Sequence, residues 1–311
     1  MNFSKGFIIN PDRFRVPSYA ISPFTTESLT IINDILNNRS NVGGSVTMQF
    51  FGENFRFTAS GKEAISMALS FYNFCHEDEV LILTSSGNKY VSSCVTSEIE
   101  KFCHWSREFS EKTKLIFVIH EFGKIHPDLE KIRDYGLPII EDLAMSMFSN
   151  NSTNSAGRIG DFAIYSLPKF FPVQFGGVLK STNADFIGDG SNRSDEKLCY
   201  LQTIAEYYLN QKEEICTARV DNYLYLESNL KKLGFESRLR PTQEEIPSVY
   251  MFTDKNTDFD GMKVFMQNNG VECSKFYGEN SFFVPVHQNL STTDLDFIIN
   301  LIEYFKNNEI K

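Results

Sequence analysis

Short apolar runs alternate with helical patterns between about residues 58 and 180. Apolar residues recur at helical spacing in residues 62–74, and a second helix is expected at 91–101. His126-Pro127-Asp128 opens a further short helix, since proline is favoured in the first turn. The intervening apolar runs predict strands at residues 79–83, 114–120, 137–142, 161–166 and 177–181.

This alternation of elements predicts the fold class. Strands that are apolar on both faces and alternate with helices indicate a mostly parallel sheet in an α/β domain of three layers. In such sheets ligands bind at the carboxyl ends of the strands. We therefore expect the functional residues in the segments that directly follow the predicted strands.

A change in pattern suggests a second, smaller domain. Residues 182–194 are polar and rich in Gly and Asn, and they are interpreted as a linker. Long helical patterns follow at about 195–212 and 215–233, and residues 234–311 mix strands with helices. We predict a large domain over 1–190, with an N-terminal arm, and a helical connection with a small α+β C-terminal domain over 191–311.

Composition and charge exclude several classes of function. The 311 residues include 40 Asp+Glu and 30 Lys+Arg, a net charge of −10 that disfavours nucleic-acid binding. The six cysteines form no C-x-x-C pair, so a zinc site and a redox motif are not expected. The sequence has neither a signal-peptide pattern nor an apolar run of about 20 residues. We expect a cytoplasmic protein with no membrane partner.

The strongest chemical signal is a lysine downstream of a carboxylate. Lys169 follows the predicted strand at 161–166 and is surrounded by Leu, Pro and Phe, whereas Asp142 ends the strand at 137–142. Burial lowers the pKa of a lysine, which leaves a neutral amine that can attack a carbonyl. An aspartate suits the pyridinium nitrogen of pyridoxal 5'-phosphate (PLP). The alternative is a lysine on an apolar turn, with Asp142 as a helix cap.

A phosphate site is predicted upstream. Ser60-Gly61-Lys62 opens a helix, where free N–H groups and the helix dipole attract anions. The alternative is an ordinary N-cap. Tyr90 follows the strand at 79–83, where it could stack on a pyridine ring or simply pack. His120, Glu121 and His126 could suggest a metal, but a structural role is the better interpretation for these histidines, and we expect no metal site.

Several spaced motifs resemble those of the DegT/StrS-type PLP-dependent sugar aminotransferases, which have the aspartate aminotransferase fold (fold type I). The matching stretches cover about 58–181, in the family's order and spacing. They are Ser60-Gly61-Lys62-Glu63-Ala64, Asp78-Glu79-Val80, His120-Glu121-Phe122-Gly123, Ile140-Glu141-Asp142-Leu143-Ala144, Gly160-Asp161-Phe162, Tyr165-Ser166-Leu167-Pro168-Lys169 and Gly176-Gly177. Asn269-Gly270-Val271-Glu272 and Val284-Pro285-Val286-His287 extend the resemblance weakly into the tail.

The resemblance implies a role for each matching residue. Lys169 would bond covalently to PLP and move the proton, Asp142 would pair with the pyridine nitrogen, and Tyr90 would stack on the ring. The phosphate would be held by Ser60, Gly61 and Ser166, with Lys62, where the family has threonine, as an added charge. Family members are homodimers with sites at the interface, and they commonly move an amino group from glutamate to a nucleotide-linked keto sugar. Surface polysaccharide or amino-sugar synthesis is the implied pathway.

Two departures from the family keep alternatives open. Met145 stands where the family has Gln or His, and the asparagine segment that reaches the neighbouring subunit has no counterpart in 182–215. The chain could therefore be a PLP-dependent dehydratase or lyase, or a non-catalytic ligand-binding protein. A retained Lys169 weighs against those dehydratases of the family that have histidine there. His287 is a further candidate for the substrate site, with a structural role as its alternative.

Overall fold

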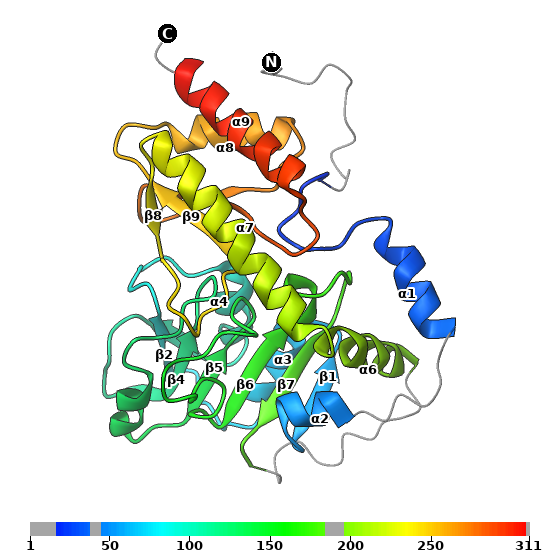
Figure 1. Cartoon of the computed structure of the whole chain (residues 1–311). Helices are drawn as coiled ribbons and strands as arrows, with labels where there is room; N and C mark the ends of the chain where they lie inside the picture. The colour runs from blue at the N-terminus through cyan, green and yellow to red at the C-terminus, as the bar shows by residue number, and fades with distance from the viewer. Residues whose placement is uncertain (1–16, 38–44, 184–195, 309–311) are drawn as a thin grey trace.

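The computed structural model describes residues 17–37, 45–183 and 196–308, and it is built on two sheets (Figure 1). The larger sheet has seven strands in the order β1-β7-β6-β5-β4-β2-β3. The bounds of these strands are β1 Phe55–Thr58, β2 Glu79–Thr84, β3 His104–Ser106, β4 Thr113–Ile119, β5 Ile139–Asp142, β6 Phe162–Ser166 and β7 Gly177–Ser181.

The larger sheet is mostly parallel, as predicted. The pairs β2·β3, β2·β4, β4·β5 and β5·β6 are all parallel. Strand β7 runs antiparallel to both β6 and β1. Only residues 167–176 separate β6 from β7, and a parallel return needs a crossover of about a dozen residues or more. The carboxyl ends of β1, β6, β5, β4, β2 and β3 therefore share one edge of the sheet with the start of β7.

Helices cover both faces of this sheet, which gives the three layers that the sequence predicts. Helices α3 (Gly61–Leu69) and α4 (Ser93–Ile99) bury their apolar side chains against one face. Helices α2 (Ser45–Phe51) and α6 (Glu196–Leu209) cover the other, together with the chain after β5. Two 3-10 helices, η1 (Leu129–Tyr135) and η2 (Leu167–Lys169), follow β4 and β6.

A smaller antiparallel sheet forms the second unit, in the order β10-β11-β9-β8. Helix α7 (Lys212–Lys232) runs diagonally from the large sheet to the small one and packs there with α8 and α9 (Figure 1). The remaining bounds are β8 Glu236–Arg238, β9 Val249–Thr253, α8 Phe259–Asn268, β10 Ser274–Phe276, β11 Ser281–Pro285 and α9 Thr292–Asn308. The predicted boundary at 190/191 lies outside the described residues.

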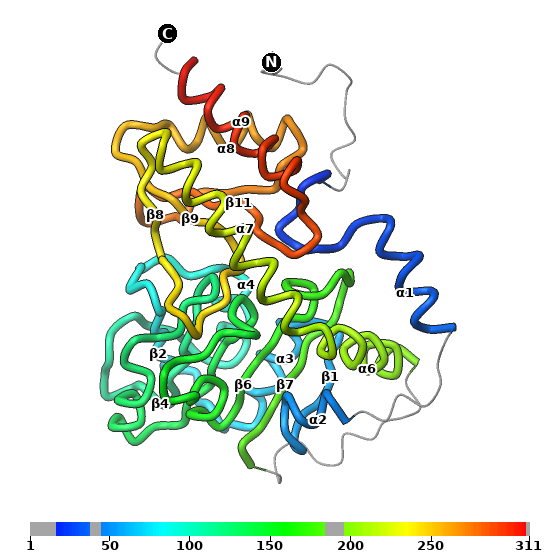
Figure 2. Tube along the Cα trace, in the orientation of Figure 1, coloured from blue at the N-terminus to red at the C-terminus, as the bar shows by residue number. Residues whose placement is uncertain are grey.

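The described chain begins beside the small sheet and then runs to the large one (Figure 2). Tyr19 forms a parallel bridge with Val271, and its ring stacks on Phe297 at a centroid distance of 5.1 Å. Helix α1 (Ser28–Asn37) then lies against α6. The segment before the large sheet thus links the two sheets, an arrangement that the apolar pattern alone did not indicate.

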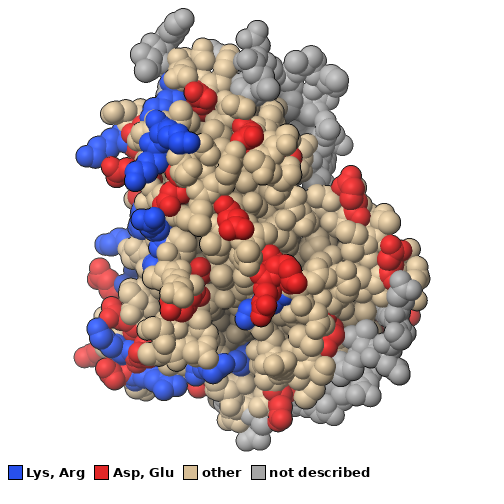
Figure 3. Space-filling model, viewed as in Figure 1, with Lys and Arg blue, Asp and Glu red and all other residues tan. Residues whose placement is uncertain are grey.

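The surface carries interspersed charges. On the face shown in Figure 3, acidic side chains lie among the basic ones along the left side, in keeping with the net charge of −10. None of the described helices combines the length and the apolar character that crossing a bilayer requires.

Candidate active site

The predicted cofactor residues follow strands whose ends meet at one edge of the large sheet. Asp142 ends β5, and Ser166 ends β6. The register pairs Asp142 with Ile164 and Ser166 with Gly177, which in turn pairs with Thr58 of β1. Ser60 and Lys169 each lie within three residues of their strand's end. The fold therefore gathers at one edge residues that are up to 109 positions apart in the sequence.

The start of α3 packs closely against the loop and strand that follow Lys169. A Cβ on Gly177 would lie 2.6 Å from the carbonyl carbon of Ser60, so this position requires glycine. A Cβ on Gly61 would lie 3.7 Å from Cβ of Ser166, which is ordinary contact. The Gly176 N–H donates to the Ala59 carbonyl at 2.9 Å. Ser60, Gly61 and Ser166 thus form a compact cup, which we call the phosphate cup.

Ser60 also caps α3, which is the role that the alternative interpretation of Ser60-Gly61-Lys62 gives it. Its Oγ accepts from the Glu63 N–H at 3.2 Å, and Glu63 Oε2 accepts from the Ala59 N–H at 2.6 Å. This is close to the capping-box pattern. The N–H groups of Gly61 and Lys62 donate to no acceptor among the described residues. The helix end therefore keeps two donors for an anion, and it places the Glu63 carboxylate nearby.

Asp142 is a buried carboxylate with one engaged oxygen. Its side chain is 6% exposed, and Oδ1 accepts from the Ala144 N–H at 2.9 Å. Burial raises the pKa of Asp142 to about 6, an effect that the hydrogen bond from the Ala144 N–H partly opposes. Oδ2 accepts no hydrogen bond from any described residue. A cationic N–H donor such as a pyridinium would satisfy this oxygen and stabilise the ionised form.

The neighbouring Glu141 has a structural role. Side chains alternate along a strand, so Glu141 faces the opposite side of the sheet from Asp142. It accepts from the N–H groups of Gly157, Ile159 and Gly160, and His120 Nε2 lies 3.2 Å away. Although burial alone would raise it, these donors hold the pKa of Glu141 below its ordinary value.

The structural interpretation of His120 agrees with this geometry. Its Nδ1 accepts from the His126 N–H at 3.1 Å, which leaves Nε2–H to donate to Glu141. No group of His, Cys, Asp and Glu that could hold a metal occurs among the described residues. His120 thus forms a buried hydrogen bond that links the end of β4 to β5.

Lys169 occupies the 3-10 turn η2 at this edge. Its side chain is half-buried, and the flanking Leu167 and Phe170 are fully buried, as the apolar surroundings predicted. No described residue accepts a hydrogen bond from its Nζ or forms an ion pair with it. Its carbonyl oxygen accepts from Arg219 Nη2 at 2.8 Å. The backbone of Lys169 is therefore tied down, whereas its amine is uncommitted.

Two other predicted residues lie at the surface. Lys62 is exposed in the first turn of α3. Tyr90 is 44% exposed, and its ring lies 5.2 Å from the ring of Tyr277, which belongs to the small sheet's unit. The sequence did not indicate that Tyr277 would contact Tyr90. Stacking of Tyr90 on a cofactor stays a prediction.

His287, the remaining candidate, is buried in the structure. It is 3% exposed, and its Nδ1 accepts from the Asn289 N–H at 3.2 Å. Burial, reinforced by the charge of Arg219, lowers the pKa of His287 to about 3. A buried neutral histidine that bonds to its own turn favours the structural alternative over contact with substrate.

The residues present fit PLP. A helix N-terminus with free N–H groups and two serine hydroxyls suits the phosphate, and the uncommitted oxygen of Asp142 suits the pyridine nitrogen. The uncommitted amine of Lys169 suits the aldehyde. All three groups follow strands of the same sheet edge.

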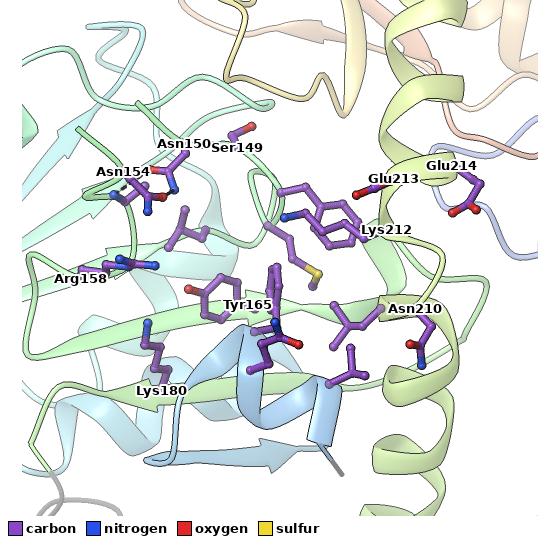
Figure 4. A pocket seen from close by; sticks show the side chains of 18 residues that line it. Ser149, Asn150, Asn154, Arg158, Tyr165, Lys180, Asn210, Lys212, Glu213 and Glu214 are labelled. Carbon is purple, nitrogen blue, oxygen red and sulfur yellow. Dashed lines mark hydrogen bonds between the residues drawn. The ribbon is translucent and has the colours of Figure 1, made fainter. Parts of the chain in front are cut away.

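A cavity of about 590 Å³ opens elsewhere, between α2, the chain after β5 and the start of α7 (Figure 4). Arg158 and Lys180 lie at one end of it, and Lys212, Glu213 and Glu214 lie at the other. Lys180 pairs with Ala163, three residues before the end of β6, so this end of the cavity lies away from the sheet edge that carries the phosphate cup. It contains none of the predicted cofactor residues.

A family model matches one segment of the large sheet's domain. Residues 104–175 match the DegT/DnrJ/EryC1/StrS aminotransferase family. This segment includes Asp142, Ser166 and Lys169.

Solved structures share the fold along nearly the whole chain. The aminotransferase TlmJ from Streptoalloteichus hindustanus matches with a TM-score of 0.73 and 15% identity, over 94% of this chain and 98% of that one. Spr1654 from Streptococcus pneumoniae, in its PLP form, matches with a TM-score of 0.70 and 16% identity, over 94% and 99%. The E. coli GDP-4-keto-6-deoxy-D-mannose-3-dehydratase with hydrated PLP matches with a TM-score of 0.69 and 13% identity, over 92% and 100%. Together, the family match over residues 104–175 and the shared fold confirm the resemblance to the PLP-dependent aminotransferases of the DegT/DnrJ/EryC1/StrS type.

Proposed function

We propose that this enzyme moves an amino group from glutamate to a nucleotide-linked keto sugar, in the synthesis of amino sugars for a surface polysaccharide. The observation that carries the proposal is the uncommitted amine of Lys169 at the same sheet edge as Asp142 and the phosphate cup. The shared fold with Spr1654, which is described as a putative sugar aminotransferase, supports a sugar as acceptor. The pairing of glutamate with a nucleotide-linked sugar is taken from the family resemblance.

The phosphate cup would hold the cofactor phosphate. The N–H groups of Gly61 and Lys62 are free to donate, and the hydroxyls of Ser60 and Ser166 can each donate one hydrogen bond. Ser60 Oγ keeps its hydrogen for this purpose, because it acts as an acceptor toward Glu63. The Lys62 ammonium adds a charge that offsets Glu63 nearby.

The two catalytic residues would act at opposite ends of the ring. Bound PLP supplies a conjugated ring that withdraws electrons from the substrate carbon that loses its proton. Asp142 would accept a hydrogen bond from the ring nitrogen and favour its protonated form. Lys169 Nζ, when free, would be the base that moves the proton at the substrate carbon. Leu167 and Phe170 are both fully buried and exclude water from one side of η2, the turn that contains Lys169. We call this segment, with Phe170, the lysine turn.

An absorbance spectrum tests this function. Purified protein incubated with PLP should show a yellow band, and glutamate should bleach it because the amino group moves onto the cofactor. A keto sugar acceptor should restore the band. A protein that binds PLP but is not bleached by any amino donor would contradict the proposed transfer.

A dehydratase or a non-catalytic ligand-binding protein is the second candidate. It is favoured by Met145, which offers no polar contact, and by the fold shared with the E. coli dehydratase. The same spectrum separates the candidates, since a ligand-binding protein would not turn over. A dehydratase would consume its sugar without gaining nitrogen, which mass spectrometry of the product would show.

We also propose a cytoplasmic homodimer with its sites at the interface. The described cysteines are all free thiols, and exposed Cys75 and Cys94 fit a reducing compartment. The dimer follows from the family resemblance, in which cofactor contacts cross between chains. Sedimentation of the PLP-loaded protein should give twice the chain mass of 35.6 kDa. A fully active monomer would overturn this part of the proposal.

Lys62→Glu should weaken the retention of PLP, because it places a second carboxylate beside Glu63 at the anion site. An effect of about tenfold or less is expected, since Lys62 is exposed and its charge is screened. Lys62→Thr should retain PLP. Dialysis followed by absorbance measures the cofactor that remains. Equal retention by the wild type and Lys62→Glu would mean that Lys62 does not act on the phosphate.

A further inference from the structure

Arg219 is a buried cation with no carboxylate partner among the described residues. It lies on α7, is 0% exposed, and is the largest fully buried side chain among the described residues. Burial lowers the pKa of Arg219 to about 9, so it stays charged at neutral pH. Burying a charge is costly, and an apolar side chain of similar size is often tolerated better. The retained arginine therefore calls for a role that an apolar residue could not fill.

Arg219 contacts the lysine turn through a hydrogen bond and a ring contact. Its Nη2 donates to the carbonyl oxygen of Lys169 at 2.8 Å, and its guanidinium lies 4.5 Å from the ring centroid of Phe170. Its Nε donates to Gln288 Oε1 at 3.0 Å. Gln288 Nε2 in turn donates to the carbonyl oxygen of Phe170 at 2.8 Å. Two linked side chains thus hold two successive carbonyls of the turn that carries the reactive amine.

The holding groups come from outside the large sheet. Gln288 follows β11 of the small sheet, and Arg219 lies in the first half of α7, the helix that joins the two sheets. The contacts span 50 residues for Arg219 and 118 for Gln288. The buried Nη1 of Arg219 has no partner among the described residues, so within that part of the chain the guanidinium donates hydrogen bonds only to Lys169 and Gln288.

We propose that Arg219, braced by Gln288, is a positioning residue that fixes the Lys169–Phe170 backbone and so sets the direction in which the Lys169 amine points. This inference rests on the proposed role of Lys169. Arg219 belongs to α7 and Gln288 follows β11 of the small sheet. The position of the small sheet therefore influences the direction in which the Lys169 amine points. Arg219 does not itself touch the substrate, since it is fully buried.

The test measures the reactivity of Lys169 in protein that carries no cofactor. Trace acetic anhydride acetylates each lysine at a rate that depends on its accessibility and protonation, and mass spectrometry reports Lys169 relative to exposed Lys62. The variants are Arg219→Met, which removes the donors and the charge, and Arg219→Lys, which keeps the charge. Gln288→Glu serves as a third variant, because it keeps an acceptor for Arg219 but cannot donate to the Phe170 carbonyl.

Asn222→Ala is the matched control. Asn222 lies one turn further along α7 and donates to the carbonyl of His287 at 3.0 Å. It therefore ties α7 to the segment after β11 that also contains Gln288, and it makes no hydrogen bond to the lysine turn. Thermal melting and circular dichroism select the variants that are folded under the labelling conditions.

Arg219→Met and Gln288→Glu should change the Lys169/Lys62 labelling ratio by about fivefold or more, since the first loses the charge-assisted hydrogen bond to the Lys169 carbonyl and the second loses the amide hydrogen bond to the Phe170 carbonyl. Arg219→Lys should lie between them and the wild type, and Asn222→Ala should stay within about twofold. Ratios within twofold of wild type in both folded Arg219→Met and folded Gln288→Glu would overturn the proposal.

A second measurement separates this inference from the proposed function. Borohydride trapping after the addition of PLP should label Lys169 more slowly in the Arg219→Met and Gln288→Glu variants than in the wild type. If the wild type traps no PLP on Lys169, the cofactor assignment fails, whereas the acetylation ratios still judge the positioning role.

Discussion

Borohydride reduction of the PLP-loaded enzyme should attach the cofactor to Lys169 and to no other lysine. The amine of Lys169 has no partner among the described residues, and it follows a strand whose end lies beside Asp142 and the phosphate cup. Reduction converts the carbon–nitrogen bond between lysine and cofactor to a stable one, so mass spectrometry of a digest locates the attachment. Lys169→Ala should bind PLP through the remaining contacts but give no labelled peptide.

The same variant should lose nearly all turnover. Removing a residue that moves a proton in the rate-determining step lowers the rate by about 10²- to 10⁴-fold, and loss of the covalent link adds to this. Lys180→Ala is the matched control, because Lys180 is also half-buried but faces the separate cavity. It should keep both label and turnover. A label on Lys180 or Lys62, or none under saturating PLP, would refute the assignment of Lys169.

Asp142→Asn should stabilise the protein without cofactor at pH 8 and yet abolish most of its activity. Burial raises the pKa of Asp142 to about 6 in the folded chain, above its ordinary value of 3.8. The carboxyl is therefore easier to ionise in the unfolded chain, and folding becomes less favourable as pH rises from about 4 to about 6. Above that range the difference corresponds to about 3 kcal/mol, which a neutral asparagine would avoid.

Chemical unfolding at pH 4 and pH 8 measures this effect. The variant should gain stability over the wild type at pH 8 and gain much less at pH 4, where the folded carboxyl is protonated and the unfolded one is only about half ionised. With PLP bound the order should reverse, because a protonated ring nitrogen pairs with the Asp142 carboxylate and not with an amide. Equal stability of the two proteins at pH 8 would mean that the carboxyl is hydrated or already paired.

The activity of Asp142→Asn gives the second half of this prediction. An uncharged partner no longer favours the protonated ring nitrogen, so bleaching by glutamate should slow by about 10²-fold or more. PLP should still be trapped on Lys169, which separates a chemical defect from loss of the cofactor. The pair of results would show that Asp142 lowers stability and is required for activity.

The main strands were predictable from the sequence because their signals are local, and the cofactor residues stay a prediction that rests on those strands. Runs such as residues 114–120 and 137–142 are apolar on both faces, which marks buried parallel strands. The rule that ligands bind at the carboxyl ends of such strands then pointed to Asp142 and Lys169. The capping role of Glu63 also had a local signal, since Ser60 and Glu63 have the spacing of a capping box.

Short elements and helix ends were less predictable. Strands β3 and β8 have three residues each and helix α2 has seven, too few for a clear periodic pattern. The helix expected over 62–74 ends at Leu69. Phe71 instead stacks on Phe162 at 5.2 Å, and the Tyr72 hydroxyl donates to Asp161 at 3.0 Å. Both contacts are with β6 or the residue before it, and tertiary packing overrides the local helical pattern.

What the sequence determined by itself was the class of fold and the positions of its main strands along the chain, and it also supplied the prediction that Lys169 and Asp142 act on the cofactor. Each depends on patterns that span about 10 to 20 neighbouring residues. The tertiary structure decided the distant contacts: Arg219 and Gln288 on the lysine turn, Tyr277 on Tyr90, Glu272 at the N-terminal segment, and the burial of His287. These residues carry no local signal, because a hydrogen bond between groups 50 to 251 positions apart depends on how packed elements meet in space and not on the neighbours of either residue in the chain.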